Sequence, residues 1–281
     1  MLMIGLSSSY FAFQKFSVYN AVKRIHELGF ETAELGAAHT FEKGIFQTLK
    51  KIKKDFSEMH FTLHGLFPPL PEKHWFNLSL GLTAQNKKIL AEMFKAAEEV
   101  EAVCVTVHPG YLSEAFFGEP DSMHYPKNKG KPIPKEKALE GCFSAAEFAL
   151  ELAEKSGIGF GIEVVPDSHF KPAIYSADDF REFFSRLPKA GLLLDMGHAL
   201  SEGRLEEMLQ FKEKIVQMHV HYSRANTFDE HKPIPSEEAV SFMKTIPQIK
   251  KIPLIFEHGT NVSEQQILTE KKLLEGFLAK A

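Results

Sequence analysis

The chain has 281 residues, 44% of them hydrophobic, which is enough to bury a large core in one or two domains. A formal net charge of −4 gives no bulk basic character that would indicate nucleic-acid binding. The chain contains no apolar run of about 18 residues, the length that a membrane span needs. The two cysteines, Cys104 and Cys142, lie in apolar surroundings, which fits a reducing compartment better than a disulfide framework. We therefore expect a cytoplasmic protein whose first residues, MLMIGLSSSYF, form a strand and not a signal peptide.

Short apolar runs alternate with longer segments of helical periodicity along the whole chain. The strand-like runs are residues 3–8, 32–36, 60–65, 103–110, 158–165, 191–198, 215–221 and 253–259. Helical spacing occupies residues 18–30, 87–100, 136–157 (ending at Gly157 as a C-cap) and 263–281, where Ser263 and Gln266 form a capping box. This alternation implies parallel pairing and predicts an α/β fold, a (β/α)8 TIM barrel formed as a single domain over residues 1–281. A doubly wound open sheet is the alternative, but no run is followed by a glycine-rich phosphate loop.

Two connections are too long to be plain turns. Residues 65–83 follow the third run and residues 110–135 follow the fourth. Long loops in a compact domain are usually functional, and both lie on the C-terminal side of strands, where barrel active sites are built.

Ionisable side chains recur at this same end of the predicted strands. Carboxylates or imidazoles close the runs from the third to the eighth, one follows shortly after the sixth, and a pair two residues apart lies in the loop after the seventh. In chain order they are His64, His108, Glu163, Asp195, His198, His219, Asp229, His231 and Glu257. The C-terminal strand ends of a barrel form one ring, so we expect these side chains to converge.

Each of these residues has a simpler interpretation when taken alone. A histidine near a strand end is most often a buried, hydrogen-bonded group, and Asp195, which follows three leucines directly, could merely cap the next helix. Together, however, the four carboxylates cannot all stay ionised in one cavity unaided, and bound cations are the simplest remedy. Mixed imidazole and carboxylate ligands suit zinc, with manganese or iron as alternatives. Nine ligands are too many for one ion, and four carboxylates carry a charge of −4, so two or three divalent ions are favoured over one.

Several short motifs resemble a known family. The stretches HPG (108–110), DMGH (195–198), DEH (229–231) and FEHG (256–259), with the strand-five glutamate and the strand-seven histidine, resemble the endonuclease IV branch of the xylose-isomerase-like barrels, AP endonuclease family 2. The resemblance implies a trinuclear zinc site held by all nine residues, with His219 chosen over His221. It also implies hydrolysis of a phosphodiester at abasic sites in DNA, a function in DNA repair. In that reaction Glu163 bridges two ions and Glu257 accepts the proton of the attacking water.

The same resemblance suggests substrate contacts. Phe67 falls where the nucleases have an aromatic that probes the DNA stack, Trp75 suits stacking on a base or a sugar, and His221 lines the pocket. Five lysines from Lys127 to Lys137 could bind phosphates or form a solvated surface. In contrast to the nucleases, the loop after the second run, GAAHTFEKG, lacks an arginine that enters DNA.

The alternative function is a sugar isomerase or epimerase of the same wider superfamily. One divalent ion would then be held by Glu163, Asp195, His219 and Glu257, with the two glutamates moving protons at a sugar carbon and the other five residues lining the pocket. The acidic net charge favours a small sugar over a duplex. A barrel that binds metal without catalysis ranks last. The expected substrate is thus DNA, a small phosphoester or a sugar, and the expected protein is a monomer with no membrane partner.

Overall fold

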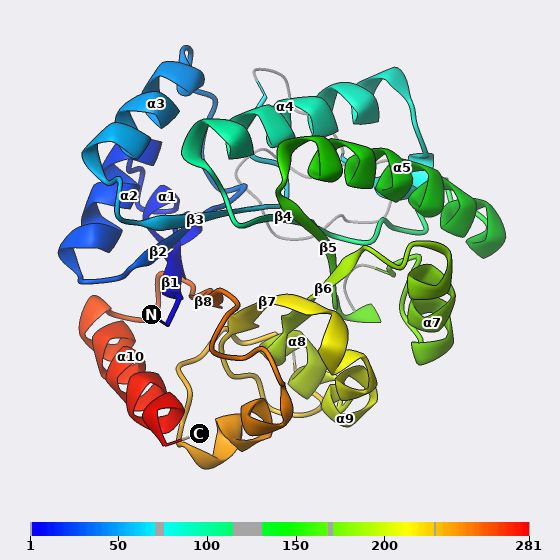
Figure 1. The fold of residues 1–281 in the computed structure, drawn as a ribbon. Coiled ribbons are helices and arrows are strands. Elements are labelled where there is room, and N and C mark those ends of the chain that lie inside the picture. Colours follow the sequence, from blue (N-terminus) through cyan, green and yellow to red (C-terminus); the bar gives the residue numbers. More distant parts are fainter. Residues whose placement is uncertain (1, 71–75, 115–130, 168–170, 228, 281) are drawn as a thin grey trace.

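Eight parallel strands close into a barrel, and helices surround it (Figure 1). The computed structural model describes residues 2–70, 76–114, 131–167, 171–227 and 229–280. The strands follow one another around the barrel in chain order, and β8 pairs with β1 to close it, which confirms the predicted TIM barrel. The strands are β1 Ile4–Ser7, β2 Thr32–Leu35, β3 His60–His64, β4 Cys104–Val107, β5 Gly159–Glu163, β6 Gly191–Asp195, β7 Ile215–Val220 and β8 Leu254–Phe256.

Each strand lies within its predicted run but is shorter. His108, His221 and Glu257 therefore come one residue after the strands that were expected to contain them. Residues 196–198 are also not part of β6, because helix α8 begins directly at Met196. The ionisable side chains thus lie at the mouth of the barrel, partly on strands and partly on the first residues beyond them.

The predicted helices are present, with others between them. The α-helices are α1 Ser9–Ala12, α2 Val18–Glu27, α3 Ile45–Asp55, α4 Ala84–Val100, α5 Lys135–Ser156, α7 Ala177–Arg186, α8 Met196–Ser201, α9 Leu205–Met208 and α10 Glu264–Ala279. Three segments are 3-10 helices: η1 Leu78–Leu80, η2 Leu209–Lys214 and η3 Glu238–Thr245. Gly157 ends α5 in the left-handed region at φ 69°, and Ser263 and Gln266 form the predicted capping box of α10. Within the described ranges, no helix is both long enough and apolar enough to span a membrane.

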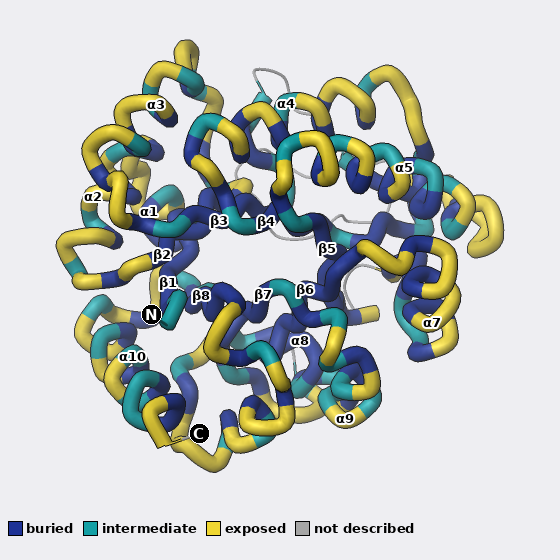
Figure 2. Tube along the Cα trace, viewed as in Figure 1, coloured by how far each residue is buried: buried dark blue, intermediate teal, exposed yellow. Residues whose placement is uncertain are grey.

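Alternating side chains divide the strands between two layers. On β6, Leu192 and Leu194 point outward into the hydrophobic core beneath the helices, whereas Asp195 points into the barrel. Figure 2 shows the strands as the buried centre of the molecule. The inward positions below the mouth are unusually polar for a barrel interior, which is normally filled by branched apolar side chains. This polar floor consists of Ser7, Thr32, Glu34, Thr62, Cys104, Thr106 and Gln217, all buried.

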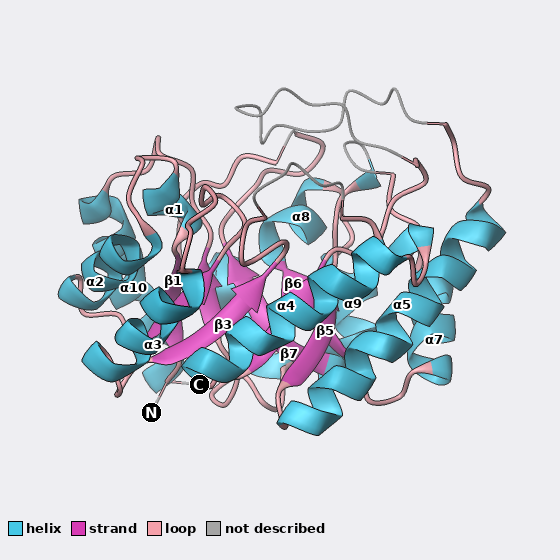
Figure 3. Cartoon of the chain, turned by 90° about the horizontal axis from the view of Figure 1, so that it is seen from above, coloured by secondary structure: helices cyan, strands magenta, loops and turns pink. Residues whose placement is uncertain are grey.

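The loops that follow the strands gather at one end of the barrel, and both chain termini lie near the other (Figure 3). One buried residue ties two of these loops together. Asn77, in the connection after β3, accepts a hydrogen bond from the Tyr111 backbone N–H at 2.8 Å and donates one to the Ser113 carbonyl at 2.8 Å. Asn77 therefore ties the described ends of the connections after β3 and β4 to each other.

A buried contact between a histidine and a glutamate anchors α10 to the loop after β7. His258 Nε2 lies 2.6 Å from Glu270 Oε2, and Glu270 Oε1 accepts a hydrogen bond from the Ile234 backbone N–H at 2.7 Å. His258 Nδ1 lies 3.1 Å from the His231 carbonyl oxygen. The last helix thus holds in place the segment that carries His231, although it contributes no side chain to the mouth of the barrel.

Replacement of Glu270 by leucine is expected to lower the free energy of unfolding by about 3–5 kcal/mol, because it leaves a buried histidine and a buried amide without an acceptor. Urea denaturation measures this change. The matched control is Glu275→Leu on the same helix, where the lost pair with Lys271 is 44% exposed on the glutamate side and is expected to cost less than about 1 kcal/mol. Equal destabilisation by both variants would contradict the anchoring role of Glu270.

Candidate metal centre

The structure brings all nine predicted residues together at the mouth of the barrel. Each belongs to at least one group whose nitrogen and oxygen atoms lie within 4.8 Å of one another. They come from six strands or strand ends, from α8 and from the loop after β7. The convergence follows from the closed barrel, since every C-terminal strand end faces the same opening.

Glu163, at the end of β5, forms the first part of the cluster. Its Oε2 lies 3.1 Å from His64 Nε2 and 3.0 Å from His108 Nε2, and its Oε1 lies 3.1 Å from His198 Nδ1. The side chain is 1% exposed. Burial alone would raise the pKa of Glu163, but the charges of His108 and His64 outweigh it and hold the pKa well below its ordinary value.

Asp195, at the end of β6, has two functions. Its Oδ1 accepts a hydrogen bond from the His198 backbone N–H at 2.7 Å and so caps α8. The same carboxylate lies 3.0 Å from His221 Nε2 and 3.4 Å from His219 Nδ1. Capping therefore accounts for one oxygen, while the carboxylate still faces the imidazoles. Burial favours a raised pKa for Asp195, but the charges of His198 and His221 lower it below its ordinary value.

Glu257, just beyond β8, completes this part of the cluster. Its Oε2 lies 3.0 Å from His219 Nδ1. Although burial favours a higher pKa for Glu257, the charge of His219 lowers it to about 2. His219 shows the reciprocal effect: burial favours a lower pKa, but Glu257 and Glu34 raise it well above its ordinary value.

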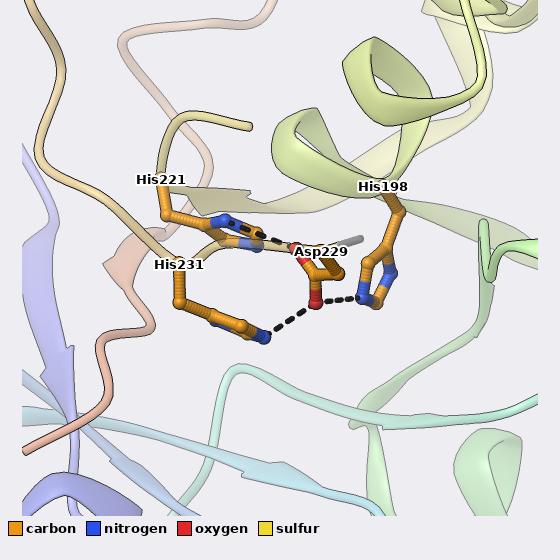
Figure 4. Close-up of side chains that lie close together, drawn as sticks. All are labelled: His198, His221, Asp229 and His231. Carbon is orange, nitrogen blue, oxygen red and sulfur yellow. Dashed lines mark hydrogen bonds and ion pairs between the residues drawn. The ribbon is translucent and has the colours of Figure 1, made fainter. Parts of the chain in front are cut away.

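Asp229 lies between three imidazoles (Figure 4). Its Oδ2 is 3.1 Å from His198 Nε2 and 2.6 Å from His231 Nε2, and its Oδ1 is 3.7 Å from His221 Nδ1. The rings of His221 and His231 stack with centroids 4.1 Å apart. Ser223 donates a hydrogen bond to Asp229 Oδ1 at 2.9 Å, which fixes the orientation of the carboxylate.

The sequence prediction preferred His219 to His221 as a metal ligand, but the structure places both side chains in the cluster. Both side chains are completely buried, both contact Asp195, and each belongs to a group with ligand spacing. Residues two apart on a strand point to the same side, so β7 brings both rings to the mouth. His221 is therefore a candidate ligand as well as a residue that lines the pocket.

The arrangement fits a divalent cation. Glu163 Oε2, His219 Nδ1 and His221 Nδ1 are buried, and among the described residues they meet no partner at hydrogen-bond angles. In the same part of the chain, no lysine or arginine lies within ion-pair distance of Glu163, Asp195, Asp229 or Glu257. Buried imidazole and carboxylate atoms that converge without a lysine or arginine beside them are suited to bind a divalent cation. The cluster is therefore a candidate site for one or more divalent ions.

Gly197 sets the position of His221. A Cβ added at Gly197 would lie 1.9 Å from His221 Cε1 and 2.1 Å from its Nδ1, so Gly197→Ala must displace the ring. We expect it to destabilise the protein by about 1–3 kcal/mol, as overpacking does, and to weaken divalent-cation binding. Urea denaturation and a Zn²⁺ titration measure the two effects.

The control is Gly276→Ala in α10, where an added Cβ meets nothing within 4 Å. Removal of a helical glycine there is expected to leave stability unchanged or to raise it by up to about 1 kcal/mol. Gly197→Ala protein as stable as this control would show that the His221 ring can move without cost.

Two residues that contact the cluster were not predicted. Glu34, on β2, has its Oε2 2.9 Å from His219 Nε2. Tyr111, in the loop after β4, has its hydroxyl hydrogen-bonded to His108 Nδ1, and burial followed by the charge of Glu163 raises the pKa of Tyr111 well above its ordinary value. A signal for Glu34 was present, because a carboxylate between the buried residues Ala33 and Leu35 needs a partner inside the barrel.

The structure does not place the predicted aromatic and lysine substrate contacts at the cluster. Phe67 is completely buried in the hydrophobic core with its ring 6.3 Å from that of His39, a position that leaves the ring no exposed face for stacking on a substrate. Trp75, Lys127 and Lys129 lie outside the described residues. Lys135 does not face the cluster, because it pairs with Asp179 at 2.8 Å.

A family model, two sequence relatives and several solved structures match this chain. The family model described as "Xylose isomerase-like TIM barrel" matches residues 22–272. Two relatives are uncharacterised proteins of Methanocaldococcus jannaschii. One is 22% identical over 258 residues, covering 89% of this chain and 80% of its own length, and the other is 22% identical over 198 residues, covering 70% and 69%.

Solved structures with the same fold have different activities. A D-tagatose 3-epimerase-like protein has a TM-score of 0.70 at 20% identity, covering 99% of this chain and 97% of its own. The D-psicose 3-epimerase of Clostridium cellulolyticum has a TM-score of 0.68 at 13% identity, covering 99% of both chains. An AP endonuclease of family 2 from Brucella melitensis has a TM-score of 0.68 at 11% identity, covering 95% and 97%. At these low identities the similarity shows only a shared fold. It does not distinguish the endonuclease IV branch, which the motifs resemble, from the sugar epimerases.

Proposed function

The chain belongs to the family of xylose isomerase-like TIM barrels, and on that premise we propose that it is a divalent-metal-dependent epimerase or isomerase of a small sugar. One observation carries the proposal. Glu257 Oε2 and Glu163 Oε1 approach the same atom, His219 Nδ1, at 3.0 and 3.9 Å. Two carboxylates that converge on one point can serve a single carbon atom as base and acid.

The residues of the cluster would hold the cation close to both glutamates. The set named from the sequence is Glu163, Asp195, His219 and Glu257, with His221 as a further candidate. A bound divalent cation supplies Lewis acidity, which polarises the sugar carbonyl and makes the neighbouring C–H acidic. Zinc and manganese both suit mixed imidazole and carboxylate ligands.

The two glutamates would carry out the proton transfers. One carboxylate accepts the proton from the carbon next to the carbonyl, and the other donates a proton to the opposite face, which inverts that carbon with no change in oxidation state. Glu257 is 23% exposed and faces the opening, whereas Glu163 is 1% exposed and lies deeper. A sugar that enters from the mouth would therefore lie between them.

The accessibility of the cluster supports a small substrate. Only His108, His231 and Glu257 among the nine have more than a tenth of their side chains exposed, at 28%, 26% and 23%. The aromatic that would have probed a DNA stack, Phe67, is buried, and the net charge of −4 opposes a polyanion. The D-tagatose and D-psicose 3-epimerase structures make ketoses the first substrates to test.

Proton exchange tests the proposal directly. The protein, loaded with Mn²⁺ or Zn²⁺, is incubated in D2O with ketopentoses, ketohexoses and their phosphates, and NMR follows deuterium at the carbon next to the carbonyl. We expect chelator-sensitive deuterium incorporation together with the appearance of the epimer or isomer. Absence of exchange with every sugar at every metal level would overturn the proposal.

Phosphodiester hydrolysis is the second candidate, and one observation favours it. His198, Asp229 and His231, with His221, form a ligand group that contains none of the four residues named from the sequence for the sugar enzyme, which gives room for a further ion. Two or three zinc ions in each chain by elemental analysis, together with chelator-sensitive nicking of an oligonucleotide that contains an abasic site, would favour this function. A single ion without nicking would favour the sugar enzyme.

A further inference from the structure

A buried carboxylate lies beneath the cluster and has no part in the proposed reaction. Glu34 is completely buried on β2. Its Oε2 accepts a hydrogen bond from Gln217 Nε2 at 2.5 Å and lies 2.9 Å from His219 Nε2. Cys104 in turn donates to Gln217 Oε1 at 3.1 Å. A chain of contacts thus crosses the polar floor from β4 through β7 to β2.

Burial of the Glu34 carboxylate destabilises the fold unless its contact with His219 compensates for it. Burying a carboxylate costs several kcal/mol, and branched apolar side chains normally fill this layer of a barrel. Its second oxygen, Oε1, meets no hydrogen-bond partner in the described part of the chain. The two contacts of Oε2 are therefore what the side chain provides, and one of them reaches a residue of the candidate metal centre.

The contact with Glu34 determines which nitrogen of His219 faces the cluster. Nε2 lies at hydrogen-bond geometry to the Glu34 carboxylate, which accepts a proton from it, so Nε2 is the protonated nitrogen. Nδ1 meets no partner at hydrogen-bond angles among the described residues, and it is left to face Glu257 Oε2 at 3.0 Å and Asp195 Oδ2 at 3.4 Å. A second hydrogen bond of this kind fixes the ring orientation and tautomer of metal-binding histidines in general.

We propose that Glu34 is a positioning residue that holds the His219 ring with Nε2–H directed at the polar floor, so that Nδ1 is available to a cation. The inference rests on the cation site of the proposed function but requires no sugar turnover. It assigns to β2, which contributes none of the nine predicted residues, the control of one ligand.

Zn²⁺ affinity of three variants tests the proposal. Glu34→Leu removes both contacts and is expected to weaken Zn²⁺ binding about 10–100-fold in competition with a chelator. Glu34→Gln is expected to bind within about fivefold of the wild type, since a single amide oxygen at the position of Oε2 accepts from both Gln217 and His219. The matched control is Thr32→Val on the same face of β2, a buried hydroxyl without a hydrogen-bond partner among the described residues, which should leave affinity unchanged.

Imidazole nitrogen NMR of the wild type gives a readout that does not depend on how well the variants fold. In the Zn²⁺-loaded wild type, we expect His219 to be protonated at Nε2 and unprotonated at Nδ1, and the Gln variant to keep this pattern. The opposite tautomer in the wild type, or a folded Glu34→Leu protein that binds Zn²⁺ as tightly as the wild type, would overturn the role of Glu34. If the wild type bound no divalent cation, the proposed function and the role of Glu34 would both fail. If it bound Zn²⁺ but gave either of the two results just named, only the role of Glu34 would fail.

Discussion

Glu257→Gln protein is expected to interconvert its sugar epimers about 10²–10⁴-fold more slowly than the wild type, the usual loss when a general acid or base is removed. The amide cannot accept the proton of the carbon acid, but its oxygen still occupies the same position. The cation affinity should therefore fall much less than the rate. Turnover and Zn²⁺ or Mn²⁺ affinity are measured on the same preparations.

Hydrogen exchange at each face of the carbon gives a more specific test of the two glutamates. If Glu163 and Glu257 serve opposite faces of one carbon, the Gln variant keeps the carboxylate for one face only. It should exchange the hydrogen of one epimer with D2O without forming the other, and Glu163→Gln should show the opposite preference where it retains the cation. Glu98→Gln, on the exposed face of α4, is the control and should behave as the wild type. Turnover within about threefold of the wild type in Glu257→Gln protein would rule out the acid–base assignment, given the size of the expected loss.

Binding of divalent cations is expected to release protons and to strengthen steeply with pH. Burial favours a lower pKa for His231, but the adjacent Asp229 carboxylate outweighs it and raises the pKa to about 9. Because this pKa lies above neutrality, the metal-free protein holds that proton throughout pH 6–8, and a cation must displace it. Apparent affinity should therefore rise about tenfold per pH unit for each displaced proton, and the gain from His231 should end near pH 9.

Zn²⁺ affinities from chelator competition between pH 6 and pH 8 provide the slope, and calorimetry in two buffers of different ionisation enthalpy counts the protons. His231→Gln should reduce the slope by about one proton. His26→Gln is the control. His26 lies on α2, its side chain is 43% exposed, and it pairs with Glu58 on the surface and with none of the nine residues of the cluster. Chelated protein should lose turnover and recover it when the cation returns. Zn²⁺ binding that does not vary with pH would show that the imidazoles are already free of protons.

The barrel and the convergence of the cluster could be predicted because both follow from periodicity. Apolar runs that alternate with helical patterns give parallel strands, and parallel strands in a closed barrel place their C-terminal residues in one ring. The boundaries were less accurate, since Asp195 both ends β6 and caps α8, so DMGH begins a helix where a strand was expected to continue. The 3-10 segment η3 was not predicted.

Other features depend on contacts that the linear pattern does not contain. Phe67 was predicted as a substrate contact from the family resemblance, but its side chain is completely buried in the core beside His39. The choice of His219 over His221 was made from the family resemblance, and the linear pattern does not support it, since an extended backbone brings residues two apart to the same side. Glu34 was missed because only the last residues of the strand-like runs were considered, and it lies within β2. Its partner His219 is 185 residues away in the sequence, so no local pattern links the two.

The distance along the chain between the partners of the polar floor has a consequence for biosynthesis. Glu34 and His219 are separated by 185 residues. While a ribosome is still producing the intervening strands, the carboxylate on β2 has no imidazole to meet and must stay hydrated, so the first strands cannot close into a dry half-barrel. Final closure therefore waits for β7 to emerge, and a nascent chain stalled before that point should remain open to proteases and chaperones.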